Sequence, residues 1–322
     1  MPGDSSFDPA VVWFDAHSDF DRRSAAPGAI VIAIDLAGSL PDLKAPFIDL
    51  QLTCASNADR KAGWICVQDP VQEVDRLTQA VDRLGPPVSV LAQVLRTASG
   101  CAATEALLVE SFAYSMLLSG REFKDWRTAH PRRPARQTES ADRVRVCRTG
   151  DVLALHLANP DQRNAFDAPM RDSLVDALQL AIVDPTIAAI ELHGDGPDFC
   201  SGGHLDEFGT SEDLSLAHAI RMLQSPVRWL GHIGVPSTAF VHGACVGAGI
   251  EIPAAAHRVV ADRTARFWLP ELAMGLIPGA GGTWSIARRI GRQRLLYWAL
   301  TGETIDASAA LSWGLVDELT DH

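Results

Sequence analysis

The sequence predicts an α/β protein in which a mainly helical N-terminal part precedes a core of alternating short strands and helices. Apolar residues recur at helical spacing in three early segments, at 71–84, 88–97 and 102–119, and Gly85-Pro86-Pro87 separates the first two. After about residue 140 the pattern changes to short apolar strands alternating with helices, which is typical of a sheet covered by helices. With 322 residues, 47% of them hydrophobic and 21% charged, the chain is long enough for two domains.

The elements follow one another with distinct signals. An isoleucine-rich run at 29–34 predicts a strand, whereas residues 36–66 are too mixed to assign. The polar, basic and proline-broken stretch 127–138 predicts a linker, so we place an N-terminal extension at 1–140 and a core at 141–322. The predicted core elements are a strand at 152–157, a helix at 170–182, a strand at 188–192, a helix at 216–230, a strand at 237–241, a helix at 247–256 and a strand at 258–261.

Composition and charge exclude several classes of partner. The net charge of -12 argues against a nucleic-acid binder and against docking on an anionic membrane. Six cysteines without a C-x-x-C pair predict neither a zinc finger nor a disulfide framework, which fits a reducing cytoplasm. The N-terminus lacks a charged region followed by an apolar core, so we expect no secretion signal. The apolar stretch 235–256 contains glycines, Glu251 and Pro253, and predicts buried elements rather than a bilayer span.

Two glycine-rich segments each lie next to a glutamate. The first runs from His242 through Gly247-Ala248-Gly249 to Glu251, and the second contains Pro270-Glu271 followed by Ile277-Pro278-Gly279-Ala280-Gly281-Gly282-Thr283. Glycines let backbone amides point at one oxygen, and carboxylates can move the protons that enolate chemistry requires. This combination predicts an enzyme that makes and quenches an enolate.

Together with Asp198-Phe199-Cys200-Ser201-Gly202-Gly203-His204-Leu205, and with Asn159-Pro160 and Arg163-Asn164-Ala165, these segments resemble the crotonase family. Members of that family include enoyl-CoA hydratases and isomerases that act on acyl-CoA thioesters. The resemblance covers roughly residues 145–319 and implies a crotonase-like core of ββα spiral turns. It implies an enoyl-CoA hydratase of fatty acid metabolism, a lyase whose coenzyme A is part of the substrate, with no other cofactor and no metal.

The resemblance also implies an oxyanion hole. By position in the family motifs, its donors are the backbone amides of Gly203 and Ala248. Removing one such donor typically costs about 3 kcal/mol of transition-state stabilisation. Ala248 lies near the predicted start of a helix, where unpaired N–H groups favour an anion. His204 stands where the family often has aspartate, a departure that affects the acyl pocket.

Two glutamates occupy the family's acid–base positions. The resemblance implies that Glu251 holds and activates water while Glu271 exchanges a proton with the α-carbon. A shared apolar pocket raises at least one of their pKa values. Taken alone, Glu251 reads equally as a first-turn helix carboxylate and Glu271 as a solvated loop residue. Having both acids favours hydration.

The remaining substrate-binding positions come from the same motifs. Arg163 is a candidate partner for a CoA phosphate, although an ordinary exposed arginine fits its position nearly as well. The full set is Arg163, Ala165, Ser201, Gly202, His204, Leu205, Gly247, Pro270 and Gly279.

Far upstream, Asp15-Ala16-His17-Ser18-Asp19 resembles a metal motif of ureohydrolases such as arginase. The other aspartate-rich motif of the ureohydrolases is missing, which favours a chance match or an N-cap turn.

One departure from the family concerns the order of the chain. Family members usually continue with helices beyond a Gly-Leu-Val motif, found here at 314–316, and the segment 69–134 repeats the order of those helices. The resemblance therefore implies a circular permutation, with trimer-forming helices ahead of the catalytic core. An unrelated helical cap is the alternative.

The resemblance also implies a homo-oligomer, either a trimer or a hexamer. The competing functions are double-bond isomerisation, thioester hydrolysis, ring cleavage and an inactive scaffold subunit.

Overall fold

A six-stranded sheet forms the centre of the core. The computed structural model describes residues 10–21, 25–43, 45–58, 63–133 and 142–321. The strands follow the order β13-β10-β8-β7-β6-β5, and every neighbouring pair is parallel except β5 with β6. Alternate residues of β6 and β8 are buried, so one face of the sheet packs against helices. The strands are β5 Val144–Thr149, β6 Val152–Leu157, β7 Ala189–Gly194, β8 Ser237–Val241, β10 Arg258–Asp262 and β13 Glu318–Thr320.

The predicted strands of the core are confirmed, but two predicted helices are interrupted by proline. The predicted helix at 216–230 divides where Ser225 caps a new helix whose first residue is Pro226. The predicted helix at 247–256 stops being α-helical at Glu251, because Pro253 cannot donate and begins a 3-10 turn. The core helices are α5 Ala168–Val183, α6 Leu214–Leu223, α7 Pro226–His232, α8 Ala248–Glu251, α9 Gly282–Ser285, α10 Ala287–Ile290, α11 Arg292–Thr301 and α12 Ala307–Trp313, with 3-10 turns η3 Pro160–Gln162, η4 Leu205–Glu207, η5 Pro253–Ala255 and η6 Glu271–Met274.

A small second sheet joins the glycine-rich segments of the core. It has the order β12-β11-β9, and its strands are β9 Ala244–Val246, β11 Arg266–Trp268 and β12 Ile305–Asp306. Beside β9, the amide of Cys200 donates to the carbonyl of Ala244 at 3.0 Å, and the amide of Val246 donates to the carbonyl of Cys200 at 3.0 Å. The segments that precede Gly203 and Ala248 therefore lie side by side.

The N-terminal extension begins with a parallel sheet, which the sequence predicted only at β2, and becomes helical from Pro70 onward. Its strands lie in chain order: β1 Val11–Asp15, β2 Ile30–Asp35, β3 Leu50–Thr53 and β4 Trp64–Cys66. The three helices predicted from periodicity are confirmed, and a fourth follows: α1 Pro70–Leu84, α2 Pro86–Ala98, α3 Ala103–Leu118 and α4 Arg121–Ala129. Helix α4 takes the first residues of the predicted linker, and residues 134–141 lie outside the described part of the chain.

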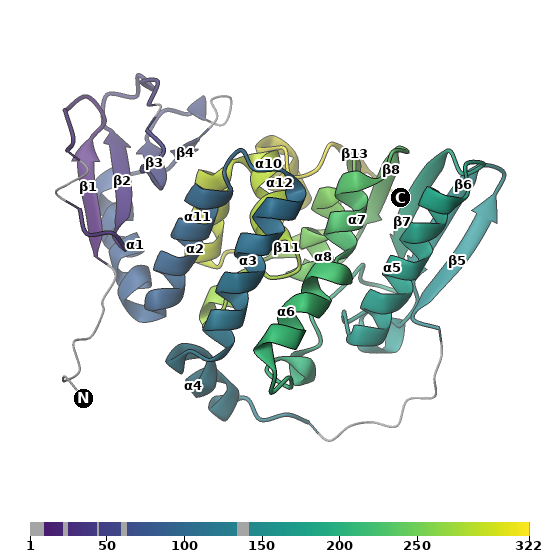
Figure 1. The fold of residues 1–322 in the computed structure, drawn as a ribbon. Helices are drawn as coiled ribbons and strands as arrows, with labels where there is room; N and C mark the ends of the chain where they lie inside the picture. The colour runs from purple at the N-terminus through teal and green to yellow at the C-terminus, as the bar shows by residue number, and fades with distance from the viewer. Residues whose placement is uncertain (1–9, 22–24, 44, 59–62, 134–141, 322) are drawn as a thin grey trace.

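The helices of the extension pack against the core. Helices α1 and α2 contact α11, α3 contacts α6, α7 and α9, and α4 contacts η6. Figure 1 shows α2 and α3 between the small N-terminal sheet and the six-stranded sheet. Leu91 and Leu107 of the extension belong to the same hydrophobic cluster as Leu295 and Trp298 of the core. Within the described residues, no helix is long and apolar enough to cross a membrane.

Candidate active site

A cavity of about 440 Å³ lies between the glycine-rich loops of the core and helices α3 and α6. We call the loop side the motif wall; it comprises Gly203, Ala248, Glu251, Glu271 and 279–281. We call the opposite side the helical wall; its residues on α3 and α6 are Leu107, Glu110, Ser111, Tyr114, Leu118, Ala217, Ile220, Arg221 and Met222. The motif wall gathers both predicted acids and both predicted oxyanion donors around one space.

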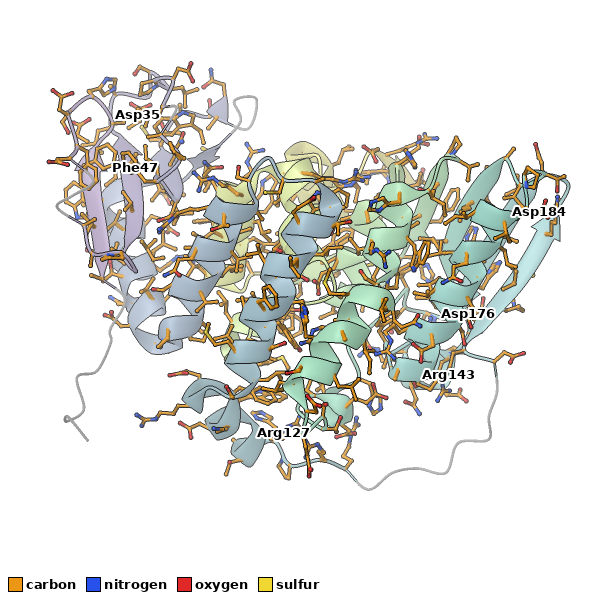
Figure 2. The ribbon with its side chains drawn as sticks, viewed as in Figure 1. Asp35, Phe47, Arg127, Arg143, Asp176 and Asp184 are labelled. Carbon is orange, nitrogen blue, oxygen red and sulfur yellow. The ribbon has the colours of Figure 1, made fainter. Side chains whose placement is uncertain are left out.

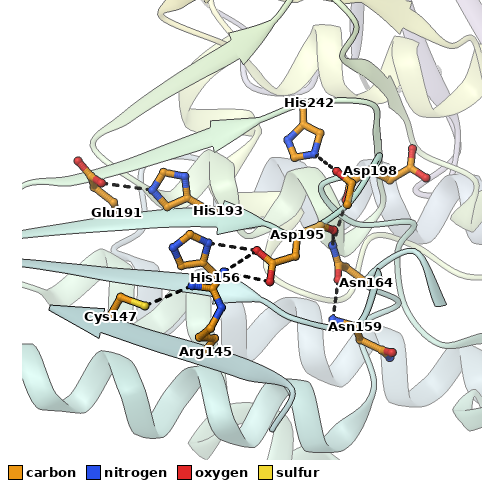
Figure 3. A network of polar contacts seen from close by, with 11 residues as sticks. Arg145, Cys147, His156, Asn159, Asn164, Glu191, His193, Asp195, Asp198 and His242 are labelled. Carbon is orange, nitrogen blue, oxygen red and sulfur yellow. Dashed lines mark hydrogen bonds and ion pairs between the residues drawn. The ribbon is translucent and has the colours of Figure 1, made fainter. Parts of the chain in front are cut away.

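The Gly203 segment is held by a buried asparagine. Asn164 adopts a left-handed conformation, and its side-chain amide donates to the carbonyl oxygens of Asp195 (2.8 Å) and Asp198 (3.0 Å). Its Oδ1 accepts from the backbone amide of Asn159 at 2.8 Å. Figure 3 shows this network at the end of the central strands. Asn164, which lies between Arg163 and Ala165 in the sequence, therefore holds the loop that leads to Gly203 through its backbone carbonyl groups.

Asp198 connects the same loop to β9. Its carboxylate accepts from the amide of Ala244 at 2.8 Å and from Nε of Arg163 at 2.6 Å. The bond from the Arg163 guanidinium lowers the pKa of Asp198. The two segments that provide the predicted oxyanion donors are thus joined by a side-chain bond as well as by the backbone bonds at Cys200.

The amides of Gly203 and Ala248 have no acceptor among the described residues. Around Gly203, the amide of Phe166 donates to the carbonyl of Gly202 (2.8 Å) and the amide of His204 donates to the carbonyl of Phe166 (3.0 Å), which leaves the Gly203 amide unused. Ala248 is the first residue of α8, so its amide has no partner within the helix. Because α8 has only four residues, the predicted contribution of a helix dipole is small. Two free N–H groups on one cavity can stabilise a developing oxyanion.

Glu251 is buried, and its carboxylate is held by backbone amides. Oε2 accepts from the amides of Ala280 and Gly282, both at 2.8 Å. Gly282 is required by this close approach, since a Cβ there would lie 2.6 Å from Cγ of Glu251. Burial is the main cause that raises the pKa of Glu251 well above its usual value, followed by the nearby Glu271 and Glu110. The two N–H bonds favour its charged form.

Glu271 has a less polar setting. It begins η6, is 8% exposed, and its Oε2 is buried without a hydrogen-bond partner among the described residues. Burial, with a smaller contribution from the neighbouring Glu110, raises the pKa of Glu271 to about 8. Gly247, at φ +48°, lies against both acids, because a Cβ at this position would contact the Oε1 atoms of Glu271 and Glu251. The two carboxyl groups therefore share one site but have different hydrogen-bond environments.

A third buried carboxyl group faces the same cavity from the helical wall. Glu110 of α3 is 2% exposed and accepts from the amides of Gly281 and Thr283 and from the Thr283 hydroxyl. Burial raises the pKa of Glu110 to about 7, against the opposing effect of the Thr283 bonds. Sequence analysis missed this residue. The available signal was a glutamate among the positions that α3 buries, which include Ala106 and Leu107.

The remaining predicted substrate-binding residues are less closely grouped. Gly279 lines the cavity, and five others are sequence neighbours of residues that do: Ala165, Gly202, His204, Gly247 and Pro270. The remaining three neither line the cavity nor adjoin a lining residue in the sequence: Arg163, Ser201 and Leu205. The Arg163 guanidinium is already paired with Asp198, and the Leu205 side chain is 46% exposed. The Nδ1 atom of His204 is buried without a partner among the described residues.

The extension also holds the loop that follows Gly203. Arg127 at the end of α4 donates to the carbonyl of Leu205 at 2.5 Å, and Arg132 donates to the carbonyls of Phe208 (3.0 Å) and Gly209 (2.7 Å). Figure 2 shows Arg127 at the lower edge of the molecule, beside the loops of the core. Phe123 of α4 packs against Gly209 and Gly275, next to η6. Helix α4 therefore contacts the neighbourhoods of both Gly203 and Glu271.

The upstream Asp-Ala-His motif lies far from the cavity, in the small N-terminal sheet. The Asp15 side chain accepts from the amide of His17 at 2.9 Å, and Nε2 of His17 lies 3.2 Å from Oδ1 of Asp35. Across the described residues, no group of three or more His, Cys, Asp or Glu side chains is placed to hold a metal ion. The motif forms a local turn and one histidine–carboxylate contact.

Comparisons with known proteins agree with this geometry. Residues 148–321 match the family described as enoyl-CoA hydratase/isomerase. Over 175 residues, 53% of this chain and 66% of the relative, the chain is 33% identical to the 1,2-epoxyphenylacetyl-CoA isomerase of Escherichia coli (strain K12). Over 176 residues, 54% of this chain and 68% of the relative, it is 34% identical to the 2,3-dehydroadipyl-CoA hydratase of the same organism.

A solved structure gives the same result for the fold. The enoyl-CoA hydratase from Thermoplasma volcanium matches with a TM-score of 0.52 and 28% identity, over 56% of this chain and 73% of that one. This confirms the predicted crotonase-like core. The matched segment spans about two-thirds of the length of the curated relatives, and their names include both an isomerase and a hydratase.

Proposed function

This chain belongs to the enoyl-CoA hydratase/isomerase family, and from that premise we propose that it adds water to an α,β-unsaturated acyl-CoA thioester. The observation that carries the proposal is the presence of two buried carboxyl groups, Glu251 and Glu271, in one cavity with two backbone amides that have no acceptor in the part of the chain that the structure describes. Hydration needs one group that activates water, one that delivers a proton, and donors for the thioester oxygen. The motif wall carries a candidate for each role.

In the proposed reaction, the thioester oxygen accepts hydrogen bonds from the amides of Gly203 and Ala248. Glu251 takes a proton from water as the water oxygen bonds to the β-carbon, and the electrons of the double bond move to the thioester oxygen to form an enolate. Glu271 then gives its proton to the α-carbon, which restores the carbonyl. The reaction starts with Glu251 charged and Glu271 protonated and ends with the opposite arrangement. Loss of one proton from Glu251 to solvent and uptake of one by Glu271 restore the starting state.

The hydrogen-bond environments support this division of roles. Burial raises the pKa of Glu251, and the two amide bonds that its carboxylate accepts at 2.8 Å oppose that rise and favour the charged form. Glu271 has an unpartnered Oε2 and a pKa raised to about 8 by burial, which favours a proton donor near neutral pH. One proton shared by the pair is expected, because two like charges in a small buried site repel each other.

The second candidate function is double-bond isomerisation. Its support is the description of the matched family, which names hydratases and isomerases together. An isomerase moves a proton between two carbons of the acyl chain and does not add water. Thioester hydrolysis and an inactive scaffold are less well supported, since both acids of the motif wall are present and buried.

Product analysis separates these functions. We would incubate the protein with short, medium and aromatic enoyl-CoAs in ¹⁸O-labelled water and analyse the products by mass spectrometry. Hydration adds one labelled water, isomerisation gives a product of unchanged mass with a new retention time, and hydrolysis releases CoA. A product panel without the water adduct contradicts the hydratase proposal. A matched control is Glu191→Gln, which alters a glutamate on β7 outside the cavity.

We also propose that α1–α4 take the place of the family's terminal helices, and that the protein is a homo-oligomer, a trimer or hexamer, in the cytoplasm. The packing of α1–α3 on α9 and α11 supports the first point. Exposed apolar side chains support the second; they include Phe112 and Met116 on α3 and Leu216 and Leu223 on α6. The six free cysteines fit a reducing compartment. Light scattering after size exclusion measures the oligomeric state, and a monomer contradicts the second point.

A further inference from the structure

Glu110 and Glu251 bind alternate amides of the same turn. Glu251 Oε2 accepts from Ala280 and Gly282, each at 2.8 Å. Glu110 Oε1 accepts from Gly281 at 2.8 Å, and Oε2 accepts from the Thr283 amide at 3.0 Å and the Thr283 hydroxyl at 2.6 Å. Four successive amides, 280–283, are thus shared between two carboxyl groups that come from opposite walls of the cavity.

This arrangement constrains the turn on both sides. Gly281 has φ +108°, a conformation that favours glycine, and a Cβ there would lie 2.6 Å from Val227. The turn begins α9, which has only four residues, so its first amides depend on side-chain acceptors. If the three Glu110 bonds are lost, the turn can move and take the two amides that hold Glu251 with it.

Glu110 also acts on the acids through charge. It raises the pKa values of Glu251 and Glu271, although burial is the larger cause for each. The other charged or titratable side chains that line this cavity, among the described residues, are Arg221 of α6, Tyr114 of α3, Arg171 of α5 and Glu207 of η4. The Arg221 guanidinium lies 5.0 Å from the centre of the Tyr114 ring. Arg221 lowers the pKa of Glu110 and donates to Ser111 at 3.1 Å.

We propose that Glu110 is a positioning residue for the acid–base pair: through the 280–283 turn it holds the amides that orient the Glu251 carboxylate. This inference rests on the proposed function for the roles of Glu251 and Glu271, and extends it by making α3 of the N-terminal extension part of the catalytic arrangement. Glu110 itself takes no proton from the substrate and affects the reaction only through the turn and through its charge.

The test compares Glu110→Gln with Glu105→Gln, the same chemical change at an exposed position of the same helix. Glutamine keeps one acceptor but turns N–H groups toward Thr283, and it removes the charge. We expect kcat to fall about tenfold in Glu110→Gln, as for loss of a hydrogen bond to a charged group. Both limbs of the pH profile of kcat should move to lower pH, because removing a neighbouring negative charge lowers the pKa values of Glu251 and Glu271. Glu105→Gln should leave both unchanged.

Two further measurements keep the test decisive. Thr283→Val removes only the hydroxyl donor and should reduce kcat about threefold if a single weaker bond is lost. The pH dependence of the melting temperature, measured for Glu110→Gln, Glu251→Gln and the double variant, reports coupling between the two acids without any turnover. Non-additive changes support the proposal, and additive changes with an unshifted pH profile overturn it. If the protein forms no water adduct but the melting temperatures still show coupling between Glu110 and Glu251, the proposed function is contradicted. The inference about Glu110 then still holds.

Discussion

The two walls of the cavity are built in different ways. The motif wall consists of short loops in which backbone amides and two carboxyl groups face the substrate space, and glycines such as Gly247 and Gly282 leave room for the acids. The helical wall consists of side chains on α3 and α6, and it contributes mostly shape, with Glu110 and Arg221 as its charged members. The difference teaches that the chemistry of this site depends on backbone geometry, whereas its volume depends on packing between distant helices. Substitutions on the two walls should therefore have different kinetic signatures.

The largest effect is expected from Glu251→Gln and Glu271→Gln on the motif wall. Each substitution removes a proton-transfer group, which typically contributes 10²–10⁴-fold, so kcat for enoyl-CoA hydration should fall by about two to four orders of magnitude. KM should change little. Steady-state kinetics measure this, with Glu191→Gln as the matched control. Turnover within threefold of the wild type in either variant would falsify the assigned role.

Ala248→Pro tests the backbone donor itself. Proline fits the first position of a helix and removes only the N–H group, and the preceding Gly247 tolerates the restriction that proline imposes. Loss of one oxyanion donor typically lowers kcat by about 10²–10³-fold. The melting temperature should change by only a few degrees. The assignment fails if a folded Ala248→Pro variant retains its kcat.

Leu107→Ala tests the helical wall. Leu107 is 4% exposed and lines the cavity, whereas the adjacent Leu108 on α3 is 37% exposed and serves as the control. Removing buried methyl groups from a binding pocket changes discrimination between acyl chains by about tenfold or more. The ratio of kcat/KM for long and short enoyl-CoAs should therefore rise in Leu107→Ala and stay constant in Leu108→Ala. If Leu107→Ala and Leu108→Ala give the same ratio of kcat/KM for long and short enoyl-CoAs, this part of α3 does not shape the acyl site.

The smallest expected effect is on stability and concerns both walls. The folded-state pKa values of Glu110 (about 7) and Glu271 (about 8) are raised from 4.5, so the folded protein binds more protons than the unfolded chain between pH 4.5 and 8. Their contribution to the free energy of unfolding is present at low pH and is lost as pH rises through this window. Glu110→Gln and Glu271→Gln should each flatten the decline in melting temperature from pH 5 to 8. If the melting temperature of a variant depends on pH as strongly as that of the wild type, the pKa of the substituted glutamate is not raised.

The sequence predicted the motif wall far better than the helical wall. Glycine turns and their acids are local signals, and the resemblance to the crotonase family implied Gly203, Ala248, Glu251 and Glu271 by their positions in its motifs. The three long helices of the extension also have a local period and are confirmed. The assigned roles of the site residues stay predictions.

The features that the sequence could not predict depend on contacts between residues that lie far apart in the chain. Strands β4, β9 and β11 have three residues each, too few for a period, and their pairing partners lie elsewhere in the chain. Glu110 was missed because its acceptor role exists only when α3 meets the turn 171 residues later. The interrupted helices after Leu223 and Glu251 could have been foreseen, since Pro226 and Pro253 both mark helix starts or stops.

The separation between Glu110 and its turn has a consequence for synthesis. Helix α3 leaves the ribosome long before Gly281 and Thr283 are translated, and at 5–20 residues per second the delay is roughly ten to thirty seconds. During that interval the nascent helix carries Glu110 and apolar side chains without their neighbours on α6, α7 and α9. The catalytic half of the polypeptide must therefore arrive before the first half can complete its folding, and a chaperone that shields α3 would be expected to raise the yield of native protein.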